Sequence, residues 1–333
     1  MMEKTNFVEN KSFFQLKMES LLPPYCPIRI TSGVDRYGFS NILAQRLKMR
    51  RVPRSFANWM HGWVWSNELT SENLMCKGLE DISIIVRNEV EQQALISEGF
   101  HNVSVGGLPF VYLPQQHAYR DENVLLAFPP HSTDGAVSNF NAINYFDYLA
   151  SLKADFEDVY VSIYWCDLHR PIHKEALARG LKVIQGANPS DANGLVRMRS
   201  LLDGFKYVTS NNMGSHMLYA LYSGCNFSFS GPMFGLNELD IMDMRSSSIS
   251  YSEKYIQETI KVYSETYLRE NFSRFFMQHP SMGVQDVEFA VDALGEKFIL
   301  QPQEIKDALG WSIIGQINGY TQGAARRVIR SLR

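Results

Sequence analysis

The sequence has few cysteines, and none has the spacing of a metal site or a disulfide framework. The four are Cys26, Cys76, Cys166 and Cys225, which lie far apart and include no C-x-x-C motif. A zinc ribbon and a disulfide-stapled domain are therefore excluded, because both need closely spaced cysteines. The remaining interpretation is a set of reduced core thiols in an intracellular protein.

Long apolar runs and an excess of positive charge are also missing. No stretch approaches the roughly 20 apolar residues of a membrane-spanning helix, and the amino-terminal MMEKTNFVENKSFF has no apolar h-region. Lysine and arginine total 32 against 35 aspartates and glutamates, a net charge of -3, so no global basic field attracts nucleic acid. We predict a cytoplasmic protein that binds no nucleic acid.

The composition is that of a globular protein with a full core. Hydrophobic residues make up 45% of the chain and charged residues 20%, which excludes general disorder. The length of 333 residues favours about two domains. The polar segment LPQQHAYRDEN at 113–123 contains a proline and precedes a new apolar run, so we place the domain boundary there.

The first part of the chain alternates short apolar runs with turns. Runs bounded by glycine or proline predict strands at 27–33, 81–88 and 102–109. Between the first two, NILAQRLKMRR has apolar side chains on one side and basic ones on the other, which predicts a surface helix.

The second part repeats strand and helix more clearly. Apolar or β-branched runs predict strands at 123–130, 159–165, 182–187, 207–212 and 226–232. Helical segments are predicted between them at 143–153, 172–179, 194–202 and 214–223. This alternation indicates a parallel sheet, because parallel strands need crossovers of about a dozen residues. Beyond Ser252 the pattern is mostly helical.

Polar residues follow several of these strands, where ligands bind in parallel sheets covered by helices. After the strand at 123–130 come His131, Ser132 and Thr133, whose imidazole and hydroxyls suit a phosphate. After the strand at 207–212 a helix start could hold a phosphate as well, and the residues there are Ser210, Asn211, Asn212, Gly214, Ser215 and His216. Asp167 and Gly186 follow two other strands and are further candidates for nucleotide contact.

Each of these groups also has a purely structural interpretation. Serine and asparagine are preferred helix N-caps, and proline followed by Asp134-Gly135 is typical of a tight turn. His216 is as compatible with packing as with ligand contact. Both interpretations stay open at the level of sequence.

Two residues of the first part are candidates for a general base. His61 lies beside Gly62 in WMHGW, where a sharp turn would present its imidazole to a substrate hydroxyl. Asp35 lies in SGVDRYGFS, which follows the predicted strand at 27–33 and lacks the dinucleotide fingerprint, so no nicotinamide or flavin cofactor is expected. The alternatives are a histidine packed among the neighbouring tryptophans and an aspartate used in a turn.

Basic residues gather in two places in an otherwise acidic chain. They are Arg46, Lys48, Arg50, Arg51 and Arg54, and, near the end, Arg326, Arg327, Arg330 and Arg333. Such clusters are either a solvated surface or a weak site for anionic lipid headgroups. We therefore expect weak peripheral association with the inner face of an anionic cytoplasmic membrane.

In combination, four segments resemble the GT-B class of glycosyltransferases, more narrowly the bacterial group that builds capsule or lipopolysaccharide chains. In chain order they are WMHGW at 59–63, GLPFVY at 107–112, FPPHS at 128–132 and VTSNNMGSH at 208–216. More distantly, His61-Gly62 is similar to a pair in CDP-glycerol transferases. His131 with Ser210 or Ser215 is similar to the histidine and hydroxyl of sialyl- and Kdo-type transferases that use CMP-sugars. In those enzymes proline follows the histidine, whereas Ser132 follows His131.

The resemblance implies two facing Rossmann-like domains with parallel sheets. An N-terminal acceptor-side domain would span 1–115, a nucleotide-sugar-binding domain 116–300, and a helical tail at 301–333 would pack back on the first domain. It also implies sugar transfer to a glycan or lipid-linked acceptor of an O-antigen or capsule, with His61 or Asp35 as the base. CMP-, UDP- and GDP-linked donors stay open. Metal-independent transfer is implied as well, and the sequence has no D-x-D triplet.

Two other functions fit the same architecture. One is a sugar-nucleotide epimerase or hydrolase, although epimerases need several carboxylates around the sugar and the predicted crevice offers few. The other is a non-catalytic subunit of glycan assembly that binds a nucleotide without turnover.

Overall fold

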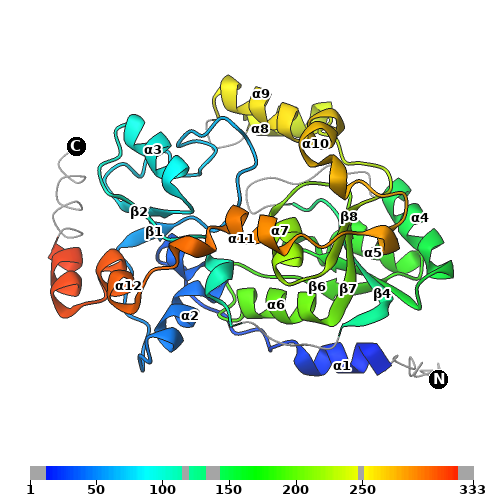
Figure 1. The fold of residues 1–333 in the computed structure, drawn as a ribbon, viewed down its shortest axis with the longest axis horizontal. Coiled ribbons are helices and arrows are strands. Elements are labelled where there is room, and N and C mark those ends of the chain that lie inside the picture. Colours follow the sequence, from blue (N-terminus) through cyan, green and yellow to red (C-terminus); the bar gives the residue numbers. More distant parts are fainter. Residues whose placement is uncertain (1–12, 115–119, 133–142, 247–250, 322–333) are drawn as a thin grey trace, which may run out of the picture.

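The computed structural model describes residues 13–114, 120–132, 143–246 and 251–321, to which all structural statements below refer. The chain has an α/β fold of two parallel sheets with flanking helices, followed by a mostly helical carboxy-terminal region (Figure 1). The predicted fold class is confirmed in these features.

The two sheets differ in size. The first is fully parallel with the order β1-β2-β3, and its strands are β1 (Ala57–Trp59), β2 (Ser83–Val86) and β3 (Val103–Val105). The second is fully parallel with the order β6-β5-β4-β7-β8. Its strands are β4 (Asp121–Phe128), β5 (Asp158–Ile163), β6 (Lys182–Gln185), β7 (Phe205–Ser210) and β8 (Asn226–Phe229).

The order of the second sheet creates a topological switch point. From the central strand β4 the chain builds outward to β5 and β6, and then returns to add β7 and β8 on the other side. Ligands of doubly wound sheets bind at such a point, beyond the carboxyl ends of the two diverging strands. Here those strands are β4 and β7, so the loops that begin after Phe128 and Ser210 flank the crevice.

Helices cover both faces of the second sheet. Leu125 and Ala127 face a cluster with α4 and α5, whereas Val124 and Leu126 face the larger core that α6 and α7 share with the first sheet. This alternation follows from the two-residue period of a strand. The helices up to the end of the second sheet are α1 (Phe13–Leu21), α2 (Phe39–Arg46), α3 (Glu89–Ser97), α4 (Ile143–Ser151), α5 (Pro171–Ala178), α6 (Gly194–Gly204) and α7 (Ser215–Tyr222).

The carboxy-terminal helices have clear start and stop residues. They are α8 (Glu238–Ser246), α9 (Glu253–Val262), α10 (Glu265–Phe272), α11 (Val287–Leu294) and α12 (Pro302–Leu309). Ser252 and Ser264 cap α9 and α10 by accepting the backbone N–H three residues later. Gly295 and Gly310 end α11 and α12 with φ of 75° and 68°, a left-handed conformation that favours glycine.

The strand predicted at 27–33 is wrong. Pro27 forms only an isolated bridge with Asp191, and the Ile28 N–H donates to the Ser190 carbonyl (2.9 Å). The segment therefore lies against a loop of the second half of the chain, the part that contains the second sheet. Proline has no N–H for a strand ladder, which excludes this position from the interior of a sheet. The first strand is β1 instead, which ends directly before the loop of His61.

The cysteines differ in burial. Cys76 and Cys225 are buried, and burial raises the pKa of each thiol to about 12, which makes both unreactive. Cys26 is exposed and Cys166 is partly exposed. The prediction of core thiols is therefore right for two cysteines and wrong for Cys26.

The first helix packs on the second half of the chain. The Phe14 ring lies 5.4 Å from the Tyr160 ring and 4.9 Å from the Phe205 ring, centroid to centroid. Met18 is buried against Gly204, where an added Cβ would lie 2.5 Å from the Met18 sulfur. Residues 13–21 therefore belong with the second sheet in space, although they precede the first one in sequence.

The end of the described chain packs on the first half. The Phe56 N–H donates to the Leu309 carbonyl (3.1 Å), and Trp311 Nε1 donates to Ser55 Oγ (3.1 Å). The domain boundaries at 115 and 300 stay predictions. Of the described helices, none is long and apolar enough to cross a bilayer.

We predict that α1 contributes strongly to stability through its buried face. Phe14→Ala removes a ring that is 5% exposed and leaves a cavity between α1 and the second sheet. Urea unfolding should show a loss of about 3 kcal/mol, the lower end for such truncations, because a short helix can shift inward to fill part of the cavity. Leu16→Ala on the exposed side of α1 is the matched control, with an expected change below about 0.5 kcal/mol. Equal effects of the two variants would mean that α1 does not dock as described.

Candidate functional site

The loop after β1 lies against the start of α7. The Trp63 N–H donates to Ser215 Oγ (2.9 Å), and the Tyr219 hydroxyl donates to the His61 carbonyl (3.0 Å). An added Cβ on Gly62 would lie 4.0 Å from Ser215 Oγ. His61 of the first half and Ser215 of the second, predicted to face each other, are therefore held in one interface.

His61 is a partly buried, neutral imidazole. Burial lowers the pKa of His61 to about 4, the nearby Arg36 charge lowers it further, and a hydrogen bond with the Trp59 backbone opposes the shift. The imidazole is therefore uncharged at neutral pH. Its ring lies against that of Tyr37, with centroids 5.6 Å apart.

The neighbouring tryptophans pack with other rings. Trp59 contacts Phe39 and Tyr112, Trp63 contacts Phe272 and Phe289, and Trp65 contacts Tyr263. The alternative of a histidine packed among tryptophans therefore gains no support from ring contacts.

Tyr37 and Tyr164 join the two halves of the chain. Their hydroxyls lie 3.1 Å apart, within hydrogen-bond distance. The Tyr164 ring is in turn 4.3 Å from the His131 ring. A continuous row of aromatic rings thus runs from His61 through Tyr37 and Tyr164 to His131.

The loop after β4 is anchored by a buried carboxylate. Asp167 is 3% exposed and accepts the Ser132 N–H at Oδ2 (2.8 Å), while its Oδ1 lies 3.6 Å from Arg170 Nε. Arg170 Nη1 also donates to Ser132 Oγ (3.1 Å). Asp167 therefore positions Ser132, and His131 directly before it is exposed. Thr133 lies outside the described residues.

The loop after β7 is fixed by its own polar side chains. Ser210 Oγ donates to the Phe128 carbonyl (2.7 Å), which ties the ends of β7 and β4 together, and Ser210 Oγ also accepts the Asn212 N–H (3.2 Å). Asn211 Nδ2 donates to the Pro232 carbonyl (2.9 Å). Asn211 Oδ1 is buried and has no hydrogen-bond partner in the described structure.

His216 lies at the switch point with one nitrogen unpaired. Its ring stacks on Phe128 with centroids 5.0 Å apart, and Nε2 is buried without a partner among the described residues. Burial, with a smaller effect from the charge of His131, lowers the pKa of His216 to about 3. An added Cβ at Gly214 would lie 2.8 Å from His216 Nδ1, so glycine leaves the space that this ring needs.

Two predicted site residues have other surroundings than the sequence indicated. Asp35 uses Oδ2 to accept the N–H and hydroxyl of Thr31 (both 2.8 Å) and the Ser32 N–H (3.1 Å), so its carboxylate closes its own turn. Gly186 follows β6 at the sheet edge, where an added Cβ would lie 2.9 Å from Ser162 Oγ. The structure does not bring Gly186 to the switch point.

A pocket of about 200 Å³ opens beside His61. Its first wall is the segment 58–66, which contributes His61, Trp63 and Trp65, and its second wall is α9, which contributes Glu258. The lining is aromatic with a few polar groups, the usual make-up of a small-ligand site.

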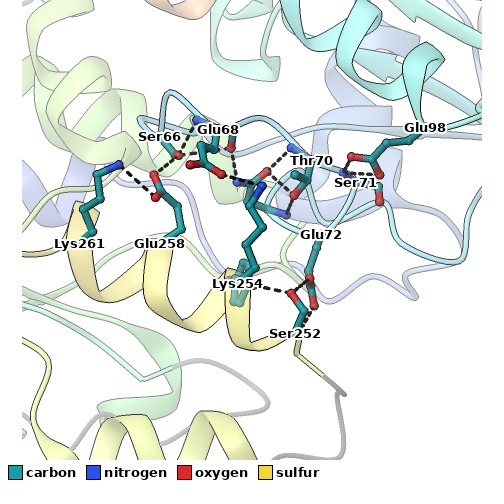
Figure 2. Close-up of polar contacts among 12 residues, drawn as sticks. Ser66, Glu68, Thr70, Ser71, Glu72, Glu98, Ser252, Lys254, Glu258 and Lys261 are labelled. Carbon is teal, nitrogen blue, oxygen red and sulfur yellow. Dashed lines mark hydrogen bonds and ion pairs between the residues drawn. The ribbon is translucent and has the colours of Figure 1, made fainter.

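Polar contacts hold the two walls of this pocket together (Figure 2). Ser66 Oγ donates to Glu258 (2.6 Å), and Lys254 Nζ lies 2.9 Å from Glu68 Oε2. At the start of α9 the Ser252 N–H donates to Glu72 (2.7 Å). The position of α9, and with it the shape of the pocket, depends on these contacts with the first half.

Sequence reasoning missed the pocket residues Asn58, Trp65 and Glu258, and it also missed four residues beside the two histidine loops. Tyr37 and Tyr164 have no motif of their own, and their contact spans 127 positions. Arg36 and Arg170 are cations near His61 and Ser132. The available signal was their place in loops already selected, because Arg36 follows Asp35 and Arg170 follows Asp167 closely. No group of three potential metal-ligating side chains occurs among the described residues.

No protein-family model matches the sequence, and no curated protein is a significant match. Among solved structures the chain is similar to TarM of S. aureus, with 13% identity, a TM-score of 0.32 and coverage of 80% of this chain and 52% of TarM. It is also similar to S. aureus MnaA with UDP, with 10% identity, a TM-score of 0.35 and coverage of 85% and 82%. A third similar structure is Arabidopsis thaliana UGT89C1 with UDP-L-rhamnose, with 11% identity, a TM-score of 0.29 and coverage of 86% of this chain and 67% of UGT89C1. The chain spans about half the length of TarM. TM-scores in this range do not establish a common fold.

We predict that His61 and His216 make the fold acid-sensitive. An unfolded histidine has a pKa of about 6.5, whereas the folded values are about 4 and about 3. Between pH 6.5 and 4 the unfolded chain therefore binds more protons, and stability falls as the pH falls through this window. His216→Phe keeps a ring on Phe128 and removes one titrating group. The slope of unfolding free energy against pH should decrease by about 1.4 kcal/mol per pH unit. An unchanged slope would show that His216 is protonated equally in both states.

Proposed function

We propose that the chain is a nucleotide-sugar-dependent glycosyltransferase of the GT-B type that needs no metal ion and extends a bacterial surface polysaccharide such as an O-antigen or capsule. The observation that carries the proposal is the convergence of two sets of strand ends. The loop of His61 after β1 contacts the α7 start after β7, at the switch point of the second sheet. A donor in that crevice would meet an acceptor held beside His61.

The donor would bind between the loops that begin at His131 and Ser210. His216 Nε2 is a buried group without a described partner, and the start of α7 offers backbone N–H groups with the positive end of the helix dipole. Arg170 and His131 would add charge at the rim of the site for the leaving phosphate. Asn211 Oδ1 is the other unpaired buried atom and would accept a hydrogen bond from the donor.

His61 would act as the general base. A neutral imidazole can accept the proton of an acceptor hydroxyl, and a bound diphosphate would raise the pKa of His61 toward the range useful near neutral pH. Arg36, which acts on His61 electrostatically, would bind donor phosphate. Asp35 is the weaker candidate, because three hydrogen bonds occupy Oδ2 in its own turn.

The acceptor would bind in the pocket between segment 58–66 and α9. Its volume of about 200 Å³ is below the roughly 300 to 1,000 Å³ of sites for drug-sized ligands, so it suits one sugar ring. Trp63 and Trp65 would stack against the apolar face of the ring. Glu258 and Asn58 would accept and donate hydrogen bonds at its hydroxyls. A lipid-linked acceptor would place the enzyme at the cytoplasmic face of the membrane.

A ligand panel followed by an assay tests this proposal. CMP, CDP, UDP, GDP and their sugars are screened by thermal shift in EDTA, and one base should stabilise the protein because a ligand of the folded state shifts unfolding by mass action. His131→Ala should weaken binding of that nucleotide by about 1 to 3 kcal/mol through loss of a charge-assisted hydrogen bond. His101→Ala, at an exposed position in the first half, is the control.

The products of the same assay separate the rival functions. Transfer to an acceptor in EDTA supports the proposal, whereas transfer that requires added magnesium or manganese contradicts it. A changed or cleaved sugar nucleotide without acceptor indicates an epimerase or hydrolase. Nucleotide binding without any turnover indicates a binding subunit.

We predict that His61→Ala lowers kcat by about 100-fold to 10,000-fold, the usual contribution of a general base. Nucleotide affinity and melting temperature should change little, because the His61 side chain has one aromatic ring contact and is only partly buried. Asp35→Asn, which keeps the shape of the side chain, is the matched comparison. If the folded fraction of His61→Ala has a normal kcat and Asp35→Asn has lost activity, Asp35 is the general base and His61 is not.

A further inference from the structure

The last described helix has its apolar side facing solvent. It begins at Ile313 and continues to the end of the described range at Thr321. Ile313, Ile314 and Ile317 are 82%, 71% and 60% exposed. At about 100° per residue these three side chains form one stripe on the helix, which is the face a globular protein normally buries.

The opposite side of this helix is made of glycines and faces the protein. An added Cβ at Gly315 would lie 2.8 Å from the Gly310 backbone, and one at Gly319 would collide with the Phe56 ring. Gln316 Nε2 donates to the Arg54 carbonyl (2.9 Å) and fixes the rotation of the helix. The isoleucines therefore cannot turn inward without pushing the helix away from Phe56.

A loop rich in cations contacts this helix through one of its arginines. Arg54 packs over the Tyr320 ring, 5.7 Å from its centroid, and thus joins the helix to the loop after α2. The loop and the helix lie at the same end of the molecule, far from β8 (Figure 1). The exposed cations there are Arg46, Lys48, Arg50, Arg51 and Arg54, and none of them has an acidic partner in the described ranges.

We propose that this surface, Ile313, Ile314 and Ile317 with the cations of 46–54, docks the protein on an anionic lipid bilayer. Isoleucines would enter the boundary between headgroups and acyl chains, and the cations would contact lipid phosphates. A second copy of the chain is a poorer occupant, because a two-fold interface centred on the stripe would bring two cation clusters together. This surface would bring the protein to a membrane that holds a lipid-linked acceptor, and only that choice of acceptor rests on the proposed function.

Vesicle co-sedimentation tests the surface without any sugar transfer. The full chain should bind vesicles of phosphatidylglycerol and phosphatidylcholine, bind phosphatidylcholine alone much less, and dissociate in high salt. Ile313→Ser, Ile314→Ser and Ile317→Ser combined should weaken binding by at least about tenfold. Arg50→Glu with Arg51→Glu should weaken it by a similar factor and reduce the salt dependence.

Two control variants match these changes elsewhere on the surface. Leu239→Ser with Met242→Ser removes apolar side chains of α8 that are 58% and 60% exposed, and should not alter binding. Arg29→Glu with Lys174→Glu makes the same charge change at other exposed positions. If the controls weaken binding as much as the test variants, only net charge and general hydrophobicity matter and the proposal is wrong.

A fluorescent label provides a direct readout of insertion. In a Cys26→Ser, Cys166→Ser background, which removes the two cysteines that are not buried, Ile317→Cys carrying an environment-sensitive dye should shift to the blue on anionic vesicles, and Leu239→Cys should not. If the protein does not bind the vesicles, the proposed docking surface is wrong. It is also wrong if the protein sediments as a dimer and the triple isoleucine variant sediments as a monomer. Sugar transfer in solution would be unaffected by that failure, whereas vesicle binding without any transfer would refute the proposed function alone.

Discussion

The interface between the loop after β1 and the start of α7 is the constraint on which the candidate site depends. The Trp63 N–H and the Tyr219 hydroxyl each make one hydrogen bond across it, to Ser215 Oγ and to the His61 carbonyl. Because these bonds use backbone groups of the loop, the imidazole of His61 stays available while its position is fixed. The strand ends of two separate sheets thereby face one crevice, which neither sheet could form alone.

The crevice holds its imidazoles neutral when no ligand is bound. Burial lowers the pKa of both His61 and His216, and Arg36 and His131 add to the effect. The site is therefore costly for a further cation, whereas the fixed charge of Arg36 beside His61 would favour an incoming anion. Under the proposed function, binding of a donor phosphate and uptake of a proton would therefore be coupled, and each would strengthen the other.

The second sheet could be predicted from the sequence because each of its strands is a short apolar run bounded by turn residues. The polar loops after β4 and β7 followed from that prediction. The first sheet was harder, since β1 spans only Ala57–Trp59 within an aromatic segment, whereas 27–33 alternates like a strand but bonds to a distant loop. The Tyr37–Tyr164 contact and the internal use of the Asp35 carboxylate depend on tertiary structure, which local pattern does not contain.

The first and last described segments each pack on the half of the protein that is distant from them in sequence. This limits how the protein can be divided into fragments. α1 docks on the second sheet through Phe14, and the segment after α12 docks on the first half through Trp311. A fragment cut between the sheets would carry one helix without its binding surface and expose the surface meant for the other. Each half thus supplies part of its neighbour's packing surface, so any relative motion of the two halves would have to carry both crossing segments along.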